Sequence, residues 1–185
     1  LRSLSLWFDG LDGPQRARPP LEGDADADVV VVGAGFTGLW TAYALLERAP
    51  DLRVVVVEQS MVGAGASGRN GGWASALFAA SRSDLARTHG AEGVRAQHRA
   101  MVASIDDIER VAGLEGIDCR FHRGGTLTVS RSAAQDHRVR AIVADDRHWG
   151  LGEEHSSLLS TSECDDRIRV AVSYTHLTLP TILLV

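Results

Sequence analysis

The chain contains two runs of four valines, Val29–Val32 and Val54–Val57. The unbroken apolar run Val54–Val57 is typical of a parallel strand that is covered on both faces. Between them, apolar side chains recur every three or four positions, at Leu39, Ala42, Tyr43, Leu46 and Ala49. This spacing predicts a helix over residues 36–49, and Pro50 ends it because proline cannot continue the hydrogen-bond ladder. The pattern therefore predicts a βαβ unit.

Three glycines lie at the turn between the first strand and the helix, in the order Gly-x-Gly-x-x-Gly. Gly33 permits the tight turn, Gly35 leaves room for a pyrophosphate, and Gly38 lets the helix pack closely on the sheet. The positive end of the helix dipole would face the phosphates. Glu58 follows the second strand, where its carboxylate can accept hydrogen bonds from a ribose diol. The unit predicts a dinucleotide site, and the acid disfavours NADP because a 2′-phosphate would meet a negative charge.

Later segments give weaker patterns. Residues 74–90 are expected to be partly helical, and 91–112 form a helix with one apolar stripe. That stripe comprises Val94, His98, Met101, Ile105, Ile108 and Val111. Residues 117–122 and 126–130 resemble strands around a Gly124-Gly125 turn, and 133–149 is another helix. Residues 1–27 hold several Gly and Pro residues and are expected to form an arm with little regular structure.

Composition excludes some functions. A net charge of −5 over 185 residues gives no electrostatic reason to expect nucleic acid or an anionic membrane as partner. No apolar run is long enough for a membrane span, and the first residues lack the apolar core of a signal peptide. Cys119 and Cys164 have no metal-binding or redox spacing, so we expect reduced thiols in a cytoplasmic protein with no metal site.

The acid after the second strand suits both NAD and FAD, and the loop that follows Glu58 distinguishes between them. Residues 63–73 read GAGASGRNGGW. Its glycines let the backbone approach a ligand, Ser67 and Asn70 can donate to phosphate or carbonyl oxygens, and Arg69 can offset phosphate charge. With the preceding unit, the loop resembles that of the D-amino-acid oxidase family of FAD-dependent oxidoreductases. The positions that carry the resemblance are Gly65, Ser67, Gly68, Arg69, Asn70, Gly71 and Gly72.

The resemblance extends more loosely from about Ser3 to Val170 and implies FAD as cofactor. It places the 63–73 loop against the FAD pyrophosphate and the flavin edge. It also implies that the arm over residues 1–27 packs on the rest of the protein through Leu6, Trp7 and Phe8. The candidate cofactor-binding residues are Gly33, Ala34, Gly35, Phe36, Thr37, Gly38, Glu58, Gln59, Ser67, Gly68, Arg69, Asn70, Gly71 and Gly72.

The resemblance also implies a reaction. In the family, a neutral amine or amino acid transfers a hydride to the flavin and the imine product hydrolyses. Residues that anchor the substrate lie mostly in the later half of such chains, so we assign no catalytic residue. His98 and Trp73 are expected to pack, and Asp106 and Asp107 to face solvent. His122 and Arg123 could approach a substrate, although polar residues at strand ends usually face water.

The expected fold class is α/β, with a Rossmann-like FAD-binding βαβ domain and the start of an inserted antiparallel α+β substrate domain. The expected boundaries are an arm over 1–27, an FAD-binding region over 28–115 and the start of the substrate domain over 116–171. The function alternatives are an NAD-dependent dehydrogenase, which would leave the 63–72 loop without a purpose, and a non-catalytic nucleotide-binding module.

The last fourteen residues, 172–185, carry no charged side chain. The string VSYTHLTLPT at 172–181 resembles one translated reading frame of a transposase adapter used in sequencing libraries, and Ala171 and Ile182 are compatible with the flanking codons. The alternative is a short apolar strand over 177–185, interrupted by Pro180. We expect residues 172–185 to be an artefact and the chain to be an N-terminal fragment of a longer enzyme. Such a fragment would be weakly folded and inactive, with exposed valine faces and unpaired strand edges.

Overall fold

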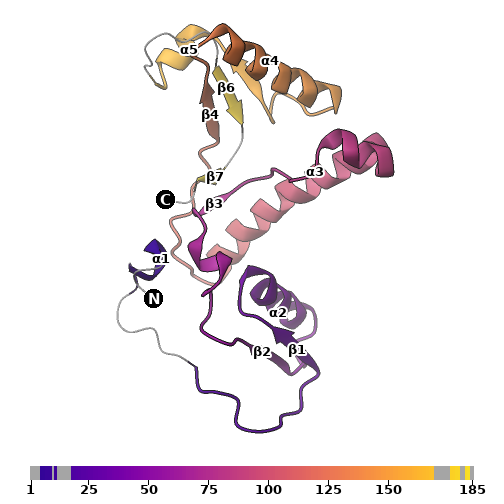
Figure 1. Cartoon of the computed structure of the whole chain (residues 1–185), viewed down its shortest axis with the longest axis vertical. Coiled ribbons are helices and arrows are strands. Elements are labelled where there is room, and N and C mark those ends of the chain that lie inside the picture. Colours follow the sequence, from indigo (N-terminus) through magenta and orange to yellow (C-terminus); the bar gives the residue numbers. More distant parts are fainter. Residues whose placement is uncertain (1–4, 10, 12–17, 169–175, 180–181, 184–185) are drawn as a thin grey trace. The chain divides into compact units, whose positions relative to one another are not determined.

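The computed structural model describes residues 5–9, 11, 18–168, 176–179 and 182–183. These residues divide into two compact units, Leu1–Gly71 and Gly72–Val185. The helices and strands of both units are labelled in Figure 1. The sequence-based boundary between residues 115 and 116 stays a prediction.

The first unit contains the predicted βαβ arrangement. Strand β1 (Val29–Val32) pairs in parallel with β2 (Val54–Val57), with Val29 opposite Val54. Helix α2 (Phe36–Arg48) connects them and packs on both strands (Figure 1). Gly33 turns the chain between β1 and α2 with φ of 98°, a left-handed conformation that favours glycine. Both strands and the helix are therefore confirmed, the helix with its end one residue earlier than expected.

The sheet of the first unit is only partly covered. Val30 is 56% exposed and Val32 is 85% exposed, while the β2 valines are all half-buried. Val54–Val57, the strand expected to be covered on both faces, is thus only partly covered, and the two β1 valines are largely exposed. Their exposed apolar surface agrees with the expectation that the valine runs present faces to water.

Short elements complete the first unit. The four-residue helix α1 (Leu6–Asp9) contacts the 3₁₀ turn η2 (Ala66–Arg69). Phe8 is buried, but Leu6 is 79% exposed. The family-based expectation that Leu6 packs on the body is therefore wrong, because a four-residue helix presents only one side to the surface it contacts.

The second unit begins with β3 (Trp73–Ala74), which pairs antiparallel with β7 (Ile182–Leu183). Helix α3 (Arg82–Leu114) follows, and Ser81 caps it by accepting a hydrogen bond from the Asp84 amide. At Gly90, φ of 66° interrupts the helical conformation and divides α3 into two helical segments. The second segment coincides with the predicted helix over 91–112. The expected apolar stripe is confirmed, with Val94, Ile105 and Val111 all less than 9% exposed.

A three-stranded antiparallel sheet lies in the same unit, in the order β4–β6–β5. Its strands are β4 (Thr126–Val129), β5 (Ser157–Leu159) and β6 (His176–Leu179). Helix α4 (Ala133–His148) confirms the prediction over 133–149 to within one residue, and α5 (Thr161–Asp165) begins at a Ser160–Glu163 capping box. Strands β6 and β7 fall on either side of Pro180. The adapter interpretation concerns the DNA and stays a prediction.

The predicted hairpin around Gly124-Gly125 is wrong. Residues 117–125 form no strand, and β4 pairs with β6. Arg120 has φ of 50°, which breaks the extended conformation in the middle of the expected strand. The Arg123 guanidinium lies 2.6 Å from an Asp106 carboxylate oxygen and 2.7 Å from one of Glu109, so ion pairs hold the segment along α3. Asp106 is therefore exposed, as expected, and it forms an ion pair with Arg123.

A buried carboxylate joins α3 and α4. Asp146 is 1% exposed, accepts a hydrogen bond of 2.6 Å from the Ser156 hydroxyl, and lies 2.6 Å from the Arg82 guanidinium. The His98 ring packs edge to face on His155, with centroids 4.4 Å apart, which agrees with the expected packing role of His98.

Among the described residues, none of the helices combines the length and apolar character that crossing a membrane requires.

Candidate cofactor site

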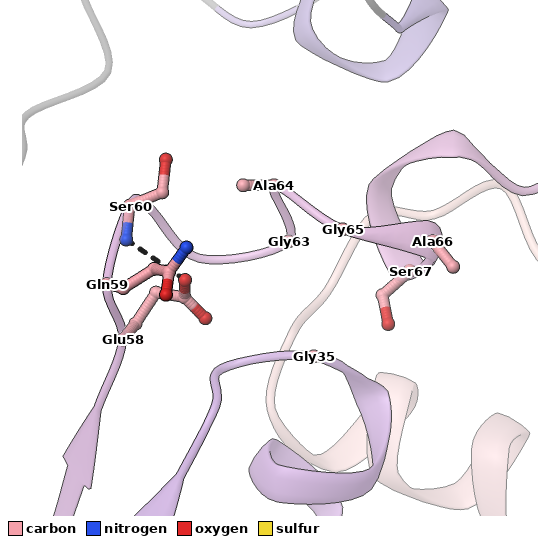
Figure 2. A pocket seen from close by; sticks show the side chains of 9 residues that line it. All are labelled: Gly35, Glu58, Gln59, Ser60, Gly63, Ala64, Gly65, Ala66 and Ser67. Carbon is pink, nitrogen blue, oxygen red and sulfur yellow. Dashed lines mark hydrogen bonds between the residues drawn. The ribbon is translucent and has the colours of Figure 1, made fainter.

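The candidate site is a pocket in the first unit of about 380 Å³. It lies between the end of β2 and the first turn of α2, and the loop after β2 closes its third side (Figure 2). The lining residues are Gly35, Glu58, Gln59, Ser60, Gly63, Ala64, Gly65, Ala66 and Ser67. Gly35, Glu58, Gln59 and Ser67 are among the residues predicted from the sequence. The βαβ unit and the glycine loop therefore meet at one pocket.

Glu58 supplies the negative charge at the end of β2. Its Oε2 accepts a hydrogen bond of 2.9 Å from the Ala34 amide, and its Oε1 accepts one of 3.0 Å from the Ser60 amide. These amides, Ala34 first, lower the pKa of Glu58 from its ordinary value. The carboxylate is exposed and ionised at neutral pH, so it can accept hydrogen bonds from hydroxyl groups of a ligand.

The N-terminus of α2 forms the opposite side of the pocket. Gly35 precedes the helix and has no side chain to cap it, so the Phe36 amide donates a 2.9 Å hydrogen bond to the Ser67 hydroxyl from the loop. A Cβ atom on Gly35 would lie 2.9 Å from that hydroxyl oxygen. The missing side chain thus lets the loop approach the helix N-terminus, where unpaired amides and the helix dipole favour an anion.

Gly38 explains why the helix lies so close to the strand. A Cβ atom there would stand 2.0 Å from the Gly33 carbonyl oxygen and 3.1 Å from Val31 Cγ1. The contact with the backbone oxygen is not tolerated, so a larger residue would push α2 away from β1. The sequence-based role of Gly38 in close helix–sheet packing is therefore confirmed.

The remaining predicted residues do not line the pocket. Ala34 is buried and holds Glu58 through its amide, whereas the Thr37 carbonyl accepts a hydrogen bond from Thr41 within α2. Arg69 is exposed, and its Nε donates to the Gly65 carbonyl. The Asn70 side chain donates to the Ser67 carbonyl. Gly68 and Gly71 belong to the first unit, and Gly72 begins the second.

Five of the lining residues are not among the candidate cofactor-binding residues predicted from the sequence: Ser60, Gly63, Ala64, Gly65 and Ala66. For the four residues at 63–66 the signal is a run of small residues, whose side chains are too small to fill the space between β2 and α2, whereas Ser60 has no such signal. Sequence reasoning also missed a contact outside the pocket, where the Trp7 indole N–H donates a 2.8 Å hydrogen bond to the Asn70 carbonyl.

The residues present fit a dinucleotide such as FAD. A helix N-terminus suits phosphate groups, and a carboxylate at the end of the neighbouring strand suits a ribose diol. Glycines at 35, 63 and 65 leave the backbone open to a ligand between them. Glu58 and the α2 N-terminus are the groups that would hold such a cofactor.

Curated relatives match about two thirds of the chain. The chain is 32% identical over 122 residues to gamma-glutamylputrescine oxidoreductase from Escherichia coli K12, covering 66% of this chain and 27% of that protein. It is 34% identical over 119 residues to the probable oxidoreductase OrdL from Haemophilus influenzae, covering 64% and 27%. The chain thus spans about a quarter of the length of these relatives.

Solved structures agree in fold. L-amino acid deaminase from Proteus vulgaris superposes with a TM-score of 0.64 at 21% identity, covering 94% of this chain and 37% of that chain. Glycine oxidase from Bacillus cereus superposes with a TM-score of 0.61 at 19% identity, covering 85% and 40%. These likenesses establish an α/β fold of the FAD-binding type. Residues 28–177 match the family described as FAD dependent oxidoreductase, and the chain belongs to that family.

Proposed function

We propose that this chain forms the FAD-binding portion of an oxidoreductase that oxidises a small amine or amino acid. The observation that carries the proposal is the meeting of three groups at one pocket: the ionised Glu58, the α2 N-terminus and the 63–67 loop. In this arrangement Glu58 would accept hydrogen bonds from the ribose of FAD. The α2 amides and Ser67 would hold its pyrophosphate.

The substrate class follows from the relatives. Gamma-glutamylputrescine oxidoreductase, glycine oxidase and L-amino acid deaminase are all named for amine or amino-acid chemistry. Bound FAD would supply a hydride acceptor for oxidation at the carbon next to nitrogen, and the protein would bind and orient the reactants. The described residues of this chain would hold the cofactor, and we assign none of them to the substrate.

Cofactor analysis tests the proposal directly. The protein would be expressed from the complete reading frame that contains this sequence, and its flavin would be released by denaturation and identified by chromatography. We expect FAD. Glu58→Ala should weaken FAD binding about 10- to 100-fold, as expected for hydrogen bonds to a charged group, whereas the exposed Glu22→Ala should leave binding unchanged. A protein that binds NAD and no flavin would contradict the proposal.

Activity and gene structure supply the second test. Reduction of an artificial dye would be followed with a panel of amines and amino acids, and we expect turnover with at least one of them.

Sequencing the source DNA across codon 170 would show whether the frame continues beyond the adapter-like segment. We also expect the 185-residue chain expressed alone to be weakly folded and to retain little FAD. A cooperatively melting yellow protein of that length would oppose this expectation.

A further inference from the structure

The N-terminal arm, defined here as Ser5–Asp9, lies on the loop that closes the cofactor pocket. The Trp7 indole donates a 2.8 Å hydrogen bond to the Asn70 carbonyl. The Ser5 hydroxyl donates to the Gly68 carbonyl and also accepts a 3.2 Å hydrogen bond from the Trp7 amide. Two side chains of the arm thus bind two backbone carbonyls of the loop, more than sixty positions away in sequence.

Phe8 adds an apolar contact to these hydrogen bonds. Its side chain is 8% exposed, the most buried residue of the arm, and its Cζ would lie 3.2 Å from a Cβ atom placed on Gly68. The same Cβ atom would lie 2.1 Å from the Gly63 carbonyl oxygen. Gly68 is therefore enclosed by the Phe8 ring and by the beginning of its own loop, and only glycine fits there.

The other side of the same loop lies on the cofactor-binding helix. Ser67 accepts the hydrogen bond from the Phe36 amide at the start of α2, one residue before the carbonyl that Ser5 holds. In a trans peptide the N–H points opposite to the C=O. Because Trp7 holds the Asn70 carbonyl, it also turns the Gly71 amide away from the arm. The arm consequently determines the orientation of peptide groups in the loop.

We infer that Trp7 and Phe8 are positioning residues for the FAD-binding loop. The inference rests on the proposed function, because it is the cofactor that this loop would hold. A segment with glycines at 63, 65, 68, 71 and 72 loses much conformational entropy when a ligand orders it. Contacts that order the loop beforehand remove part of that cost and raise the affinity for the ligand. Neither residue lines the pocket, so both act through the loop.

The experiment compares three variants of the protein expressed from its complete reading frame. Trp7→Phe keeps an aromatic ring, although a smaller one, and removes the N–H donor. Phe8→Ala removes the packed ring. The control is Leu6→Ala, because Leu6 lies on the same short helix and is 79% exposed. Hydrogen exchange of residues 63–71 is measured without FAD, and the dissociation constant is measured by titration of the apoprotein with FAD.

We expect faster exchange across 63–71 in Trp7→Phe and Phe8→Ala, and unchanged exchange in Leu6→Ala. FAD binding should weaken about fivefold in Trp7→Phe, the change that one neutral hydrogen bond contributes, and more in Phe8→Ala. Thermal unfolding of the three apoproteins separates a local effect on the loop from general destabilisation, since Trp7→Phe should leave the midpoint within a degree or two of Leu6→Ala.

The outcomes separate the inference from the proposed function. If the unaltered protein binds no FAD, the proposed function fails, and the exchange measurement still shows whether the arm orders the loop. If the unaltered protein binds FAD but Trp7→Phe and Phe8→Ala match Leu6→Ala in exchange and affinity, the inference is overturned while the proposed function stands.

Discussion

Residues 28–71 and residues 72–168 are stabilised by different kinds of contact. In the first region, backbone groups approach one another where side chains are missing, as at Gly38 against the Gly33 carbonyl. In the second, long side chains join distant segments, as when Arg82 binds Asp146 and Arg123 binds Asp106. The first kind of contact depends on residues close together in sequence. The second kind of contact is an ion pair, which many combinations of arginines and carboxylates in the sequence could form. Only the fold decides which arginine meets which carboxylate.

The buried carboxylate of the second region should give the largest effect. Asp146→Ala leaves Arg82 and Ser156 without their buried partner, so we expect a loss of about 3 kcal/mol in the free energy of unfolding. Asp145 is the matched control, because it binds the same guanidinium at 2.9 Å but is exposed. Asp145→Ala should cost less than about 1 kcal/mol. Denaturant unfolding measures both, and equal losses would show that burial does not distinguish the two carboxylates.

The closest backbone approach of the first region should give the next effect. Gly38→Ala places a methyl group 2.0 Å from the Gly33 carbonyl oxygen, and relieving this contact should cost about 1–3 kcal/mol. Gly65→Ala is the control, since its Cβ atom would meet nothing within 4 Å and its φ is −78°. Thermal unfolding of the apoproteins makes the comparison. A Gly38→Ala variant as stable as Gly65→Ala would refute the steric explanation.

The pair His98 and His155 makes the second region sensitive to pH. Burial is the largest cause that lowers the pKa of both histidines. The His155 ring and the Arg82 guanidinium lower the pKa of His98 further, whereas the Asp146 carboxylate offsets part of the decrease in the pKa of His155. The charged groups around the pair are Arg82, Asp146, Arg147 and Glu154. The folded protein therefore binds these protons less tightly than the unfolded chain.

This direction gives the sign of the pH dependence. The stability contributed by neutral histidines is present above their ordinary pKa, about 6.5, and is lost as the pH falls below it. We expect the unfolding midpoint to decrease between pH 7.5 and 5.5, and to decrease less in His155→Gln. The exposed His89→Gln should keep the full decrease. If the unfolding midpoint of His155→Gln decreases with pH as much as that of the unaltered protein, the histidine pair is not the cause of the decrease.

The exposed ion pairs should give the smallest effect. Arg123→Ala removes contacts to Asp106 and Glu109, whose side chains are about half exposed, so we expect a loss below about 1 kcal/mol. Screening by salt should reduce this loss further. Denaturant unfolding at low and high ionic strength checks both statements. A larger loss that salt does not change would mean that Arg123 positions the 117–125 segment by packing rather than by charge.

The two regions also differ in how well their structure could be predicted. In the first region, the predicted strands and helix matched the structure to within one residue, at Val29–Val32, 36–49 and Val54–Val57. Hydrophobic period and glycine spacing, which predicted them, are local properties of the sequence. The 117–122 strand was wrong, since Arg120 adopts a left-handed conformation and Arg123 binds carboxylates on α3. Neither feature has a signal in the neighbouring residues. Strand β4 was predicted, but its partner β6 lies about fifty residues further along.

The sequence by itself determined the βαβ unit, the acid after its second strand and the glycine loop, because backbone conformation and steric space depend on each residue and its near neighbours. From these features followed a dinucleotide site, and from the loop's resemblance followed FAD. Only the tertiary structure decided that Ser67 meets the first amide of α2, that Trp7 and Phe8 hold the loop, and that Asp146 is buried. These contacts join residues distant in sequence, and their geometry exists only once the chain has folded.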